Sequence, residues 1–149
     1  MSFKFLFQTD HTIIRFLKKY NGPLARTAIF IVFFWFGALK IIGQSPANPL
    51  VADLLTKTLP FITFNTFIIL FGIFEMIIGA LFLIPNAERV AILFLVVHMI
   101  TTILPLILLR SVTWNGFLIP TLEGQYIIKN IAIIALAAGV AAHLHPMKQ

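Results

Sequence analysis

The sequence predicts an all-α integral membrane protein, a four-helix bundle preceded by an interfacial amphipathic helix. Two features of composition favour this class: 60% of the 149 residues are hydrophobic and only 11% are charged. A soluble domain usually carries about 25% charged residues. The third observation is that apolar runs recur four times, each near the roughly 20 residues that a helix needs to cross a bilayer.

Residues 1–22 are expected to form a cytoplasmic segment outside the bundle. Thr9-Asp10-His11-Thr12 can cap a short helix, which Asn21-Gly22 would end. Its apolar residues alternate with Arg15, Lys18 and Lys19, a pattern typical of a helix lying in the membrane interface. Anchoring to the membrane is the simplest role, and docking of a regulatory partner is the alternative.

Residues 23–149 are expected to form one four-span domain, with spans at 24–43, 61–84, 90–109 and 126–144. Pro105 is expected to kink the third span, which neighbouring helices can tolerate in a membrane. Residues 51–58 are amphipathic, and we expect a short helix there across the mouth of the bundle. Pro23 is expected to open the first span, and the breakers between spans are 45–49, Pro85-Asn86 and Trp114-Asn115-Gly116.

The charges of the loops predict the topology. Basic residues concentrate before the first span, between the second and third, and after the fourth, whereas the other side has only Lys57 and Arg110 outside the spans. The positive-inside rule then places both termini in the cytoplasm. The charges on the cytoplasmic side are Lys4, Arg15, Lys18, Lys19, Arg26, Arg89 and Lys148.

Composition also excludes several classes of function. The formal net charge of +6 does not indicate nucleic-acid binding, because most basic residues flank apolar runs, where they meet lipid headgroups. The chain has no cysteine, which excludes disulfides, thiol relays and thiolate metal sites. A redox role would need a bound cofactor or a partner subunit.

Glu75 is the residue that points most strongly to function. It is the only charge in the run 61–84, and a carboxylate at that depth costs at least about 2.5 kcal/mol on insertion scales. Glu75 and His98 should lie at similar depths on adjacent antiparallel helices, where they could share a hydrogen bond and a proton. The pair could serve as a proton relay, as a clamp on a quinone or solute, or as a polar staple between helices.

A second group of polar residues is expected near the outer surface. Facing inward, they would ring a pocket mouth and attract an anionic or polar headgroup; facing outward, they would meet lipid phosphate. The lipid role is favoured for Arg110 and the pocket for Lys40 and Lys129, with Glu123 as counter-ion. The group comprises Lys40, Arg110, Glu123, Gln125, Tyr126 and Lys129.

The other histidines do not indicate a cofactor. His143 and His145 fall about 10 Å or more from the depth of His98, so a haem held by two histidines of one chain is not expected. A metal shared with His11 is less favoured than contact with lipid headgroups, and we predict no metal site. The fourth span is rich in small residues, which allow close packing inside the bundle or in a homodimer.

Several short motifs together resemble the DoxX-like family of small four-helix bacterial membrane proteins, near its reactive-chlorine-resistance branch. The resemblance covers residues from about Leu24 to the C-terminus. It rests on 37–40, 75–79, His98 with Thr101-Thr102, and above all on 121–130, which reads TLEGQYIIKN. It implies a four-helix bundle in the bacterial inner membrane, and it implies functional roles for Lys40, Glu75, Glu123 and Lys129, with His98 less well supported.

The family resemblance does not imply one activity. Its members include quinone-linked subunits of oxidoreductases, components of oxidant-stress systems, and assembly or trafficking factors. We expect an accessory or ligand-binding membrane protein of redox or stress physiology, without autonomous catalysis. Its ligand would be a quinone or another lipid-soluble molecule, and its partner a redox or stress-response protein. A quinone-reactive subunit, a small transporter or channel, and an assembly factor remain as alternatives.

Overall fold

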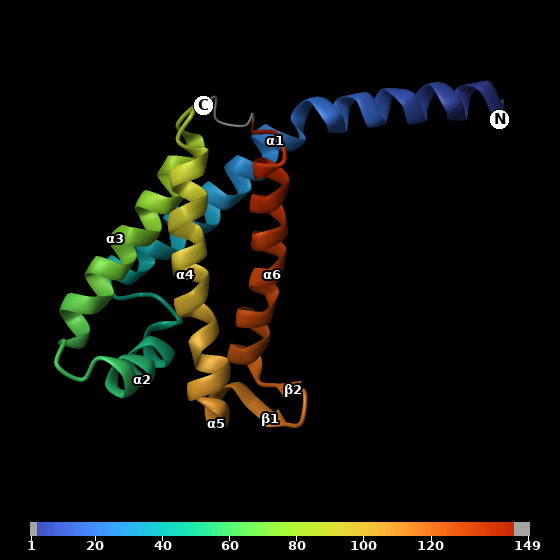
Figure 1. Cartoon of the computed structure of the whole chain (residues 1–149). Helices are drawn as coiled ribbons and strands as arrows, with labels where there is room; N and C mark the ends of the chain where they lie inside the picture. The colour runs from blue at the N-terminus through green and yellow to red at the C-terminus, as the bar shows by residue number, and fades with distance from the viewer. Residues whose placement is uncertain (1–2, 145–149) are drawn as a thin grey trace, which may run out of the picture.

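The computed structural model describes residues 3–144, including the side chains of residues 9–144. His145, Lys148 and the side chain of Lys4, all used in the sequence predictions, lie outside this part. The helices are α1 (Phe3–Ile41), α2 (Asn48–Thr58), α3 (Phe64–Leu83), α4 (Glu88–Leu108), α5 (Arg110–Thr113) and α6 (Leu122–Ala141). Two short strands, β1 (Trp114–Gly116) and β2 (Ile119–Pro120), form an antiparallel hairpin (Figure 1).

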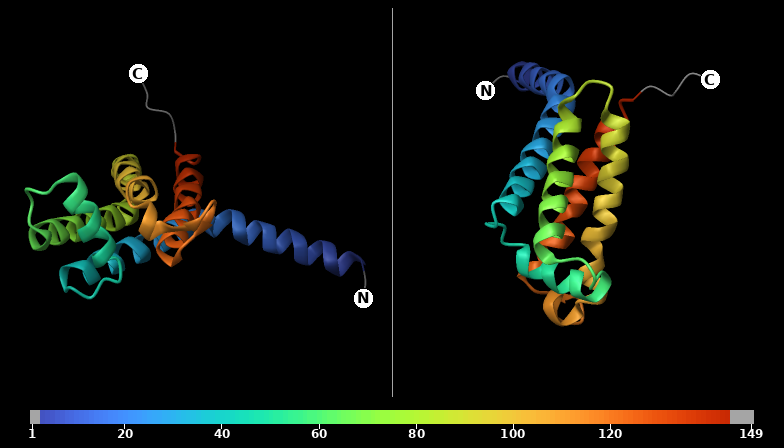
Figure 2. Two further views of the ribbon diagram at one scale, coloured as in Figure 1. Left: turned by 90° about the horizontal axis from the view of Figure 1, so that it is seen from below. Right: turned by 90° about the vertical axis from the view of Figure 1, so that its left-hand side faces the viewer.

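Four helices, α1, α3, α4 and α6, are long and apolar enough to cross a membrane, as the sequence predicts. They pack side by side as a bundle in which α1 and α4 each contact both α3 and α6 (Figures 1 and 2). The N-terminal half of α1 and the end of α6 lie at one end, called the termini end. At the other, the loop end, lie α2, α5 and the hairpin.

The expected break between an N-terminal helix and the first span is absent. The prediction that Asn21-Gly22 ends a helix is wrong, because α1 runs without interruption through both residues. Gly22 does not adopt the left-handed conformation that commonly ends a helix. Pro23 lies inside α1, where it removes one backbone donor and favours a bend rather than an end. Figure 1 shows α1 changing direction as it leaves the bundle.

The true end of α1 is set by Gly43. This glycine has a φ of 74°, in the left-handed region. Its N–H donates to the carbonyl of Lys40 at 3.1 Å, and the N–H of Gln44 donates to that of Leu39 at 2.8 Å. This pair of bonds is a Schellman motif, which terminates helices at glycine. Lys40 is therefore fixed in the last turn of α1.

The short helix expected at 51–58 is present as α2, at the loop end of the bundle. Lys57 Nζ donates to the carbonyl of Leu108 at 2.8 Å. Leu108 is in the last turn of α4, where carbonyls lack partners within their own helix. This bond attaches α2 to α4.

The start of α6 is defined by side-chain and backbone contacts with the preceding segment. Residues 114–116, expected as a loop, form the first strand of the hairpin. The Thr121 hydroxyl accepts from the N–H of Gly124 at 3.1 Å and donates to the carbonyl of Val112 at 2.7 Å. A Cβ at Gly124 would collide with the carbonyl oxygen of Thr113, so only glycine allows this approach.

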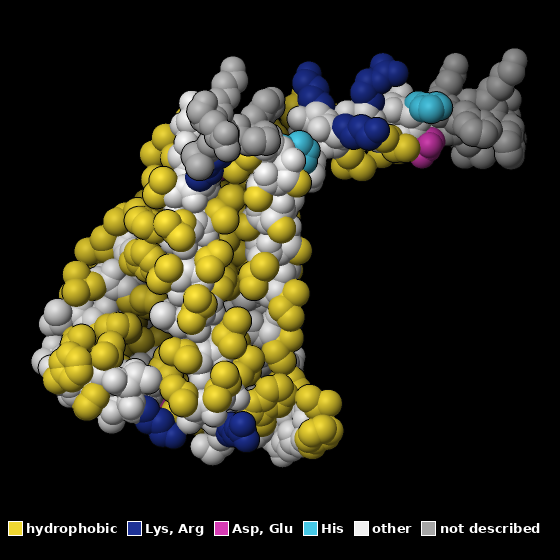
Figure 3. Space-filling view, in the orientation of Figure 1, with side chains coloured by type: hydrophobic (Ala, Val, Ile, Leu, Met, Phe, Trp, Pro, Cys, Tyr) yellow, Lys and Arg dark blue, Asp and Glu magenta, His cyan; other side chains and the backbone are white. Residues whose placement is uncertain are grey.

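The outward faces of the bundle are apolar. Large hydrophobic side chains more than half exposed include Leu70, Leu93 and Ile131 (Figure 3). A soluble monomer rarely exposes so extensive an apolar surface, and lipid is the solvent that suits it. The interior core is built from Ala25, Ile29, Phe33, Ile78, Phe82, Ala91, Leu95, Met99, Ala137 and Val140.

Candidate functional site

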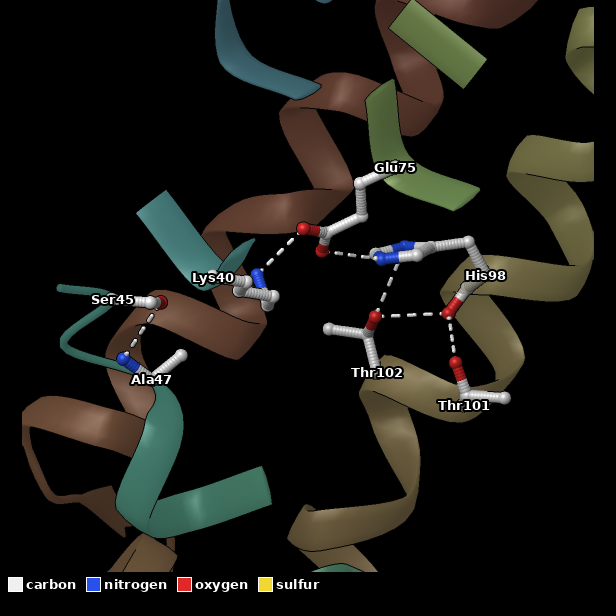
Figure 4. A network of polar contacts seen from close by, with 7 residues as sticks. All are labelled: Lys40, Ser45, Ala47, Glu75, His98, Thr101 and Thr102. Carbon is white, nitrogen blue, oxygen red and sulfur yellow. Dashed lines mark hydrogen bonds and ion pairs between the residues drawn. The ribbon is translucent and has the colours of Figure 1, made fainter. Parts of the chain in front are cut away.

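Three ionisable side chains from three helices meet in the interior of the bundle. Glu75 of α3 contacts Lys40 of α1 through Oε2 and Nζ, 2.6 Å apart, and His98 of α4 through Oε1 and Nε2, 2.9 Å apart (Figure 4). Each of the three residues is only 5% exposed. We call Lys40, Glu75 and His98 the triad. The Glu75–His98 contact is the one that matched depth predicts, whereas the contact with Lys40 is new.

Close packing of α1 on α3 brings Lys40 to Glu75. A Cβ at Gly37 would lie 2.5 Å from the carbonyl oxygen of Gly72, and one at Gly72 would lie 2.7 Å from that of Gly37. The two glycines therefore let the backbones touch. Farther along α3, a Cβ at Gly79 would lie 3.0 Å from the backbone nitrogen of Phe34, so the close contact continues.

The direction of the side chains completes this contact. Lys40 and Glu75 each lie three residues beyond their glycine, about 4.5 Å along helices that run in opposite directions. Side chains tilt toward the N-terminus of their own helix. The side chains of Lys40 and Glu75 therefore lean from opposite sides toward the point where Gly37 and Gly72 meet. Lys40 Nζ also lies 5.6 Å from the centroid of the Phe71 ring, within reach of a cation–π contact.

His98 is enclosed by aromatic rings. The Phe71 ring stacks on the imidazole at a centroid distance of 5.1 Å and an interplanar angle of 9°. The Phe33 ring meets it edge-on at 5.0 Å and 72°. The Phe74 ring lies farther away, at 6.3 Å. These contacts fix the plane of the imidazole, which leaves Nε2 facing Glu75 and Nδ1 facing Thr102.

The Thr102 hydroxyl has one hydrogen and two neighbours that can receive it. Its Oγ1 lies 2.9 Å from the backbone oxygen of His98 and 3.2 Å from His98 Nδ1. When the hydroxyl donates to Nδ1, the imidazole is neutral and Nε2–H donates to Glu75. When it donates to the backbone oxygen, Oγ1 accepts from Nδ1–H. The proton between Nε2 and Glu75 is then an additional one, held by either group.

The imidazole of His98 thus has two hydrogen-bonding arrangements that differ by one proton. With Lys40 as the ammonium, the first gives the triad no net charge and the second gives it one positive charge. Rotation of the Thr102 hydroxyl converts the bonding pattern of one into that of the other. In both, each nitrogen of the imidazole keeps a hydrogen-bonding partner, which avoids the cost of an unpaired polar atom in apolar surroundings. Chemically, this arrangement can accept a proton, release it, or present it to a ligand.

The structure does not bring the expected outer group together around Lys40. Lys40 is buried in the triad, whereas the other five members are exposed. The reason is the face of α6 that packs inward, which carries Gly124 and Ile127. Lys129 lies over the ring of Tyr126, with Nζ 5.4 Å from the centroid. The five exposed members are Arg110, Glu123, Gln125, Tyr126 and Lys129.

The other histidines whose side chains are described lie apart from the triad. His11 is exposed on the N-terminal half of α1. His143 is exposed after the end of α6, and its Nδ1 lies 2.8 Å from the carbonyl oxygen of Gly139. Among the described residues, no three histidine, aspartate or glutamate side chains are grouped to hold a metal ion.

A second ion pair, which the sequence analysis does not predict, lies at the termini end. Arg26 Nη1 is 2.6 Å from Glu88 Oε1. The same guanidinium donates to the carbonyls of Phe82 at 2.6 Å and Ile84 at 3.1 Å. Arg26 therefore fastens α1 to the turn between α3 and α4. The sequence contains a signal for this ion pair. Arg26 lies near the start of the first span and Glu88 lies just before the third, and both of these span ends are predicted on the side of the termini.

Comparisons with protein-family models, curated proteins and solved structures found no match to this chain. The candidate site therefore stands on its geometry and on the residues themselves.

Proposed function

We propose that this protein is an accessory component of the bacterial inner membrane, in which the triad binds a lipid-soluble ligand and exchanges a proton with it. Four helices would cross the membrane, with both termini in the cytoplasm. The apolar outward faces and the basic residues around the termini end support this placement. A role in redox or oxidant-stress physiology follows from the DoxX-like resemblance, which is part of the proposal.

The observation that carries the proposal is the burial of three ionisable groups in one contact network. A charged side chain near the bilayer centre costs about 2.5–3.5 kcal/mol on insertion scales, and such residues mark pathways or sites. Hydroxyl or amide side chains could hold the helices together at lower cost. The network also has a second arrangement that holds one more proton, which a purely structural staple does not need.

Access to the triad would be through the lipid-facing side of Phe71. This residue is half-buried, stacks on His98 and contacts Lys40. A sideways movement of its ring would open the triad to a ligand dissolved in the bilayer. Lys40 would attract a carbonyl or other electron-rich oxygen of that ligand, and the Glu75–His98 pair would hold the proton beside it.

A quinone-reactive subunit is the second candidate, and the aromatic surroundings of His98 favour it. Flat rings beside a proton donor are suited to a flat, apolar ligand that takes up protons. Reduction of a quinone to a quinol adds two electrons and two protons. A partner reductase would supply the electrons, since the chain has no cysteine, and the Glu75–His98 pair would pass protons to the ring oxygens.

The test is native mass spectrometry of protein purified in mild detergent, with organic extraction and a visible spectrum of the same sample. We expect a stoichiometric lipid-soluble ligand in the wild-type protein and at least a tenfold lower occupancy in Glu75→Gln, a substitution that keeps the side-chain volume. Exposed Glu123→Gln is the matched control and should retain the ligand. A protein that is empty in both samples, or equal occupancy in Glu75→Gln, would contradict the proposal and favour an assembly role.

A further inference from the structure

The part of α1 that extends beyond the bundle carries an exposed amphipathic surface. Residues 3–22, called the arm, project sideways from the termini end (Figures 1 and 2). The side chains of residues 9–20 are all exposed. The arm is thus a helix supported by the bundle at one end only, and its exposed residues are arranged in a definite order.

Three apolar residues of the arm form one stripe. Ile13, Leu17 and Tyr20 follow the spacing i, i+4, i+7. At 3.6 residues per turn these positions share one face. Their exposures are 52%, 56% and 41%, respectively. Phe16 borders the stripe, and its ring contacts that of Tyr20 at a centroid distance of 4.6 Å.

The basic residues of the arm lie on the opposite face. Arg15, Lys18 and Lys19 fall on the side of the helical wheel away from Leu17. Asp10 is the single acid among residues 9–20, so three basic and one acidic side chain give this segment a formal charge of +2. Figure 3 shows hydrophobic atoms along the underside of the arm, toward the level of the bundle, and basic atoms above and in front of them.

This arrangement fits the surface of a bilayer that the bundle crosses. The arm lies at the end of the four long helices and turns aside from them, with its hydrophobic side toward the level of the bundle. In a bilayer crossed by the bundle, that side would face the hydrocarbon. Its basic side chains then reach the phosphate level, where long Lys and Arg chains extend to charged headgroups. A protein partner could bind an apolar stripe that faced in any direction, whereas a bilayer requires the stripe to face the side on which the bundle lies. The observed orientation therefore favours lipid.

We propose that the arm binds the anionic phospholipids of the leaflet at the termini end. The apolar stripe enters the headgroup boundary, and Arg15, Lys18 and Lys19 pair with lipid phosphates. The negative surface potential of that leaflet attracts such basic segments. This proposal concerns a surface outside the triad and does not depend on the ligand that the triad binds.

The absence of cysteine makes the test direct, because single cysteines can be introduced into the full chain for spin labelling. Leu17→Cys reports on the apolar stripe, and His11→Cys reports on the opposite face. Each labelled protein is placed in nanodiscs of phosphatidylcholine, with or without phosphatidylglycerol. Collision with oxygen measures exposure to hydrocarbon, and collision with a water-soluble nickel complex measures exposure to water.

With phosphatidylglycerol present, we expect the Leu17→Cys label to favour oxygen over nickel several-fold and the His11→Cys label to show the reverse. Replacing Arg15, Lys18 and Lys19 by glutamine should weaken binding of the arm by roughly fivefold for each charge removed. The accessibility contrast should then no longer depend on phosphatidylglycerol.

Equal nickel access at both positions in the anionic bilayer would overturn the proposal. A Leu17→Cys label shielded from both reagents would also overturn it, and would indicate a protein interface, with a partner or a second copy. A contrast that is the same with and without phosphatidylglycerol would contradict the role of the basic residues.

Discussion

Both carboxylate oxygens of Glu75 have buried partners, so the effect of changing this residue depends on what remains beside it. Glu75→Leu would leave the Lys40 ammonium buried without a counter-ion. Removing one partner of a buried ion pair typically costs about 3–5 kcal/mol, because the other charge is uncompensated. We expect this variant to insert but to lose stability of that order in detergent unfolding. Wild-type stability would mean that Lys40 finds another partner or sheds its charge.

Thr102 is the hydrogen-bonding partner of His98 Nδ1, as Glu75 is of Nε2. Thr102→Val keeps the shape but removes the hydroxyl that lies 3.2 Å from Nδ1, whereas Thr102→Ser keeps the hydroxyl. We expect the ¹⁵N resonances of His98 to shift in the valine variant and to stay near their wild-type positions in the serine variant. Loss of the signal in His98→Gln assigns it among the four histidines of the chain. An unchanged valine spectrum would contradict the hydroxyl's role.

At this scale the sequence predicts part of the triad. Counting residues from the span ends puts Glu75 and His98 at one depth, because helical rise is regular. The same counting does not predict the contact of Lys40 with Glu75, because depth along the helix axis does not give the direction of a long side chain. Its pairing depends on the Gly37–Gly72 contact and on the helix end at Gly43, both of which require knowing that α1 lies against α3.

The functional roles of Glu123 and Lys129, which are exposed near the start of α6, are still predictions that rest on the family resemblance. Glu123 and Lys129 are in the most specific matching motif, yet the structure places them away from the triad. The same motif contains Thr121 and Gly124, which cap α6 and allow its backbone to approach Thr113. Part of the motif is therefore explained by folding.

At the scale of helices, the α1–α3 contact positions the triad. Gly37→Ala places a methyl group 2.5 Å from the Gly72 carbonyl oxygen and 2.8 Å from the side chain of Met76. Overpacking of this kind typically costs about 1–3 kcal/mol, and here it would also separate Lys40 from Glu75. We expect a lower unfolding midpoint in detergent.

Gly139→Ala on α6 is the matched control for this substitution. A Cβ at Gly139 has nothing within 4 Å among the described residues, so the variant should be neutral or slightly more stable. If Gly37→Ala unfolds at the same midpoint as Gly139→Ala, the close approach of α1 and α3 is not required for the fold.

The sequence predicts the four long helices because the length of an apolar run is a direct consequence of bilayer thickness. It does not predict that α1 continues through Asn21-Gly22. Those residues can end a helix, but they end one only when glycine takes the left-handed conformation, as Gly43 does and Gly22 does not. The hairpin of β1 and β2 is too short to leave a periodic pattern.

At the scale of the whole molecule, the arrangement of the two ends predicts which loops are accessible from outside the cell. Asp53 on α2 and Pro85 between α3 and α4 are both exposed, and they lie toward opposite ends of the bundle. We expect a membrane-impermeant maleimide to label Asp53→Cys in intact spheroplasts and Pro85→Cys only after lysis. The reverse pattern would place the termini outside and contradict the proposed topology.

The central claim is that the triad serves a function rather than the stability of the bundle, and the triple variant Lys40→Met/Glu75→Leu/His98→Leu tests it most directly. All three members are replaced, because removing Lys40 and Glu75 alone would leave the buried Nε2 of His98 without its partner. Replacing every member of a buried ion pair or triad by apolar residues is often neutral or stabilising by about 1–4 kcal/mol. Detergent unfolding and bound ligand are measured on the same sample. We predict a protein at least as stable as the wild type that has lost its lipid-soluble ligand. A triple variant that unfolds readily, or that keeps the ligand, would contradict the claim.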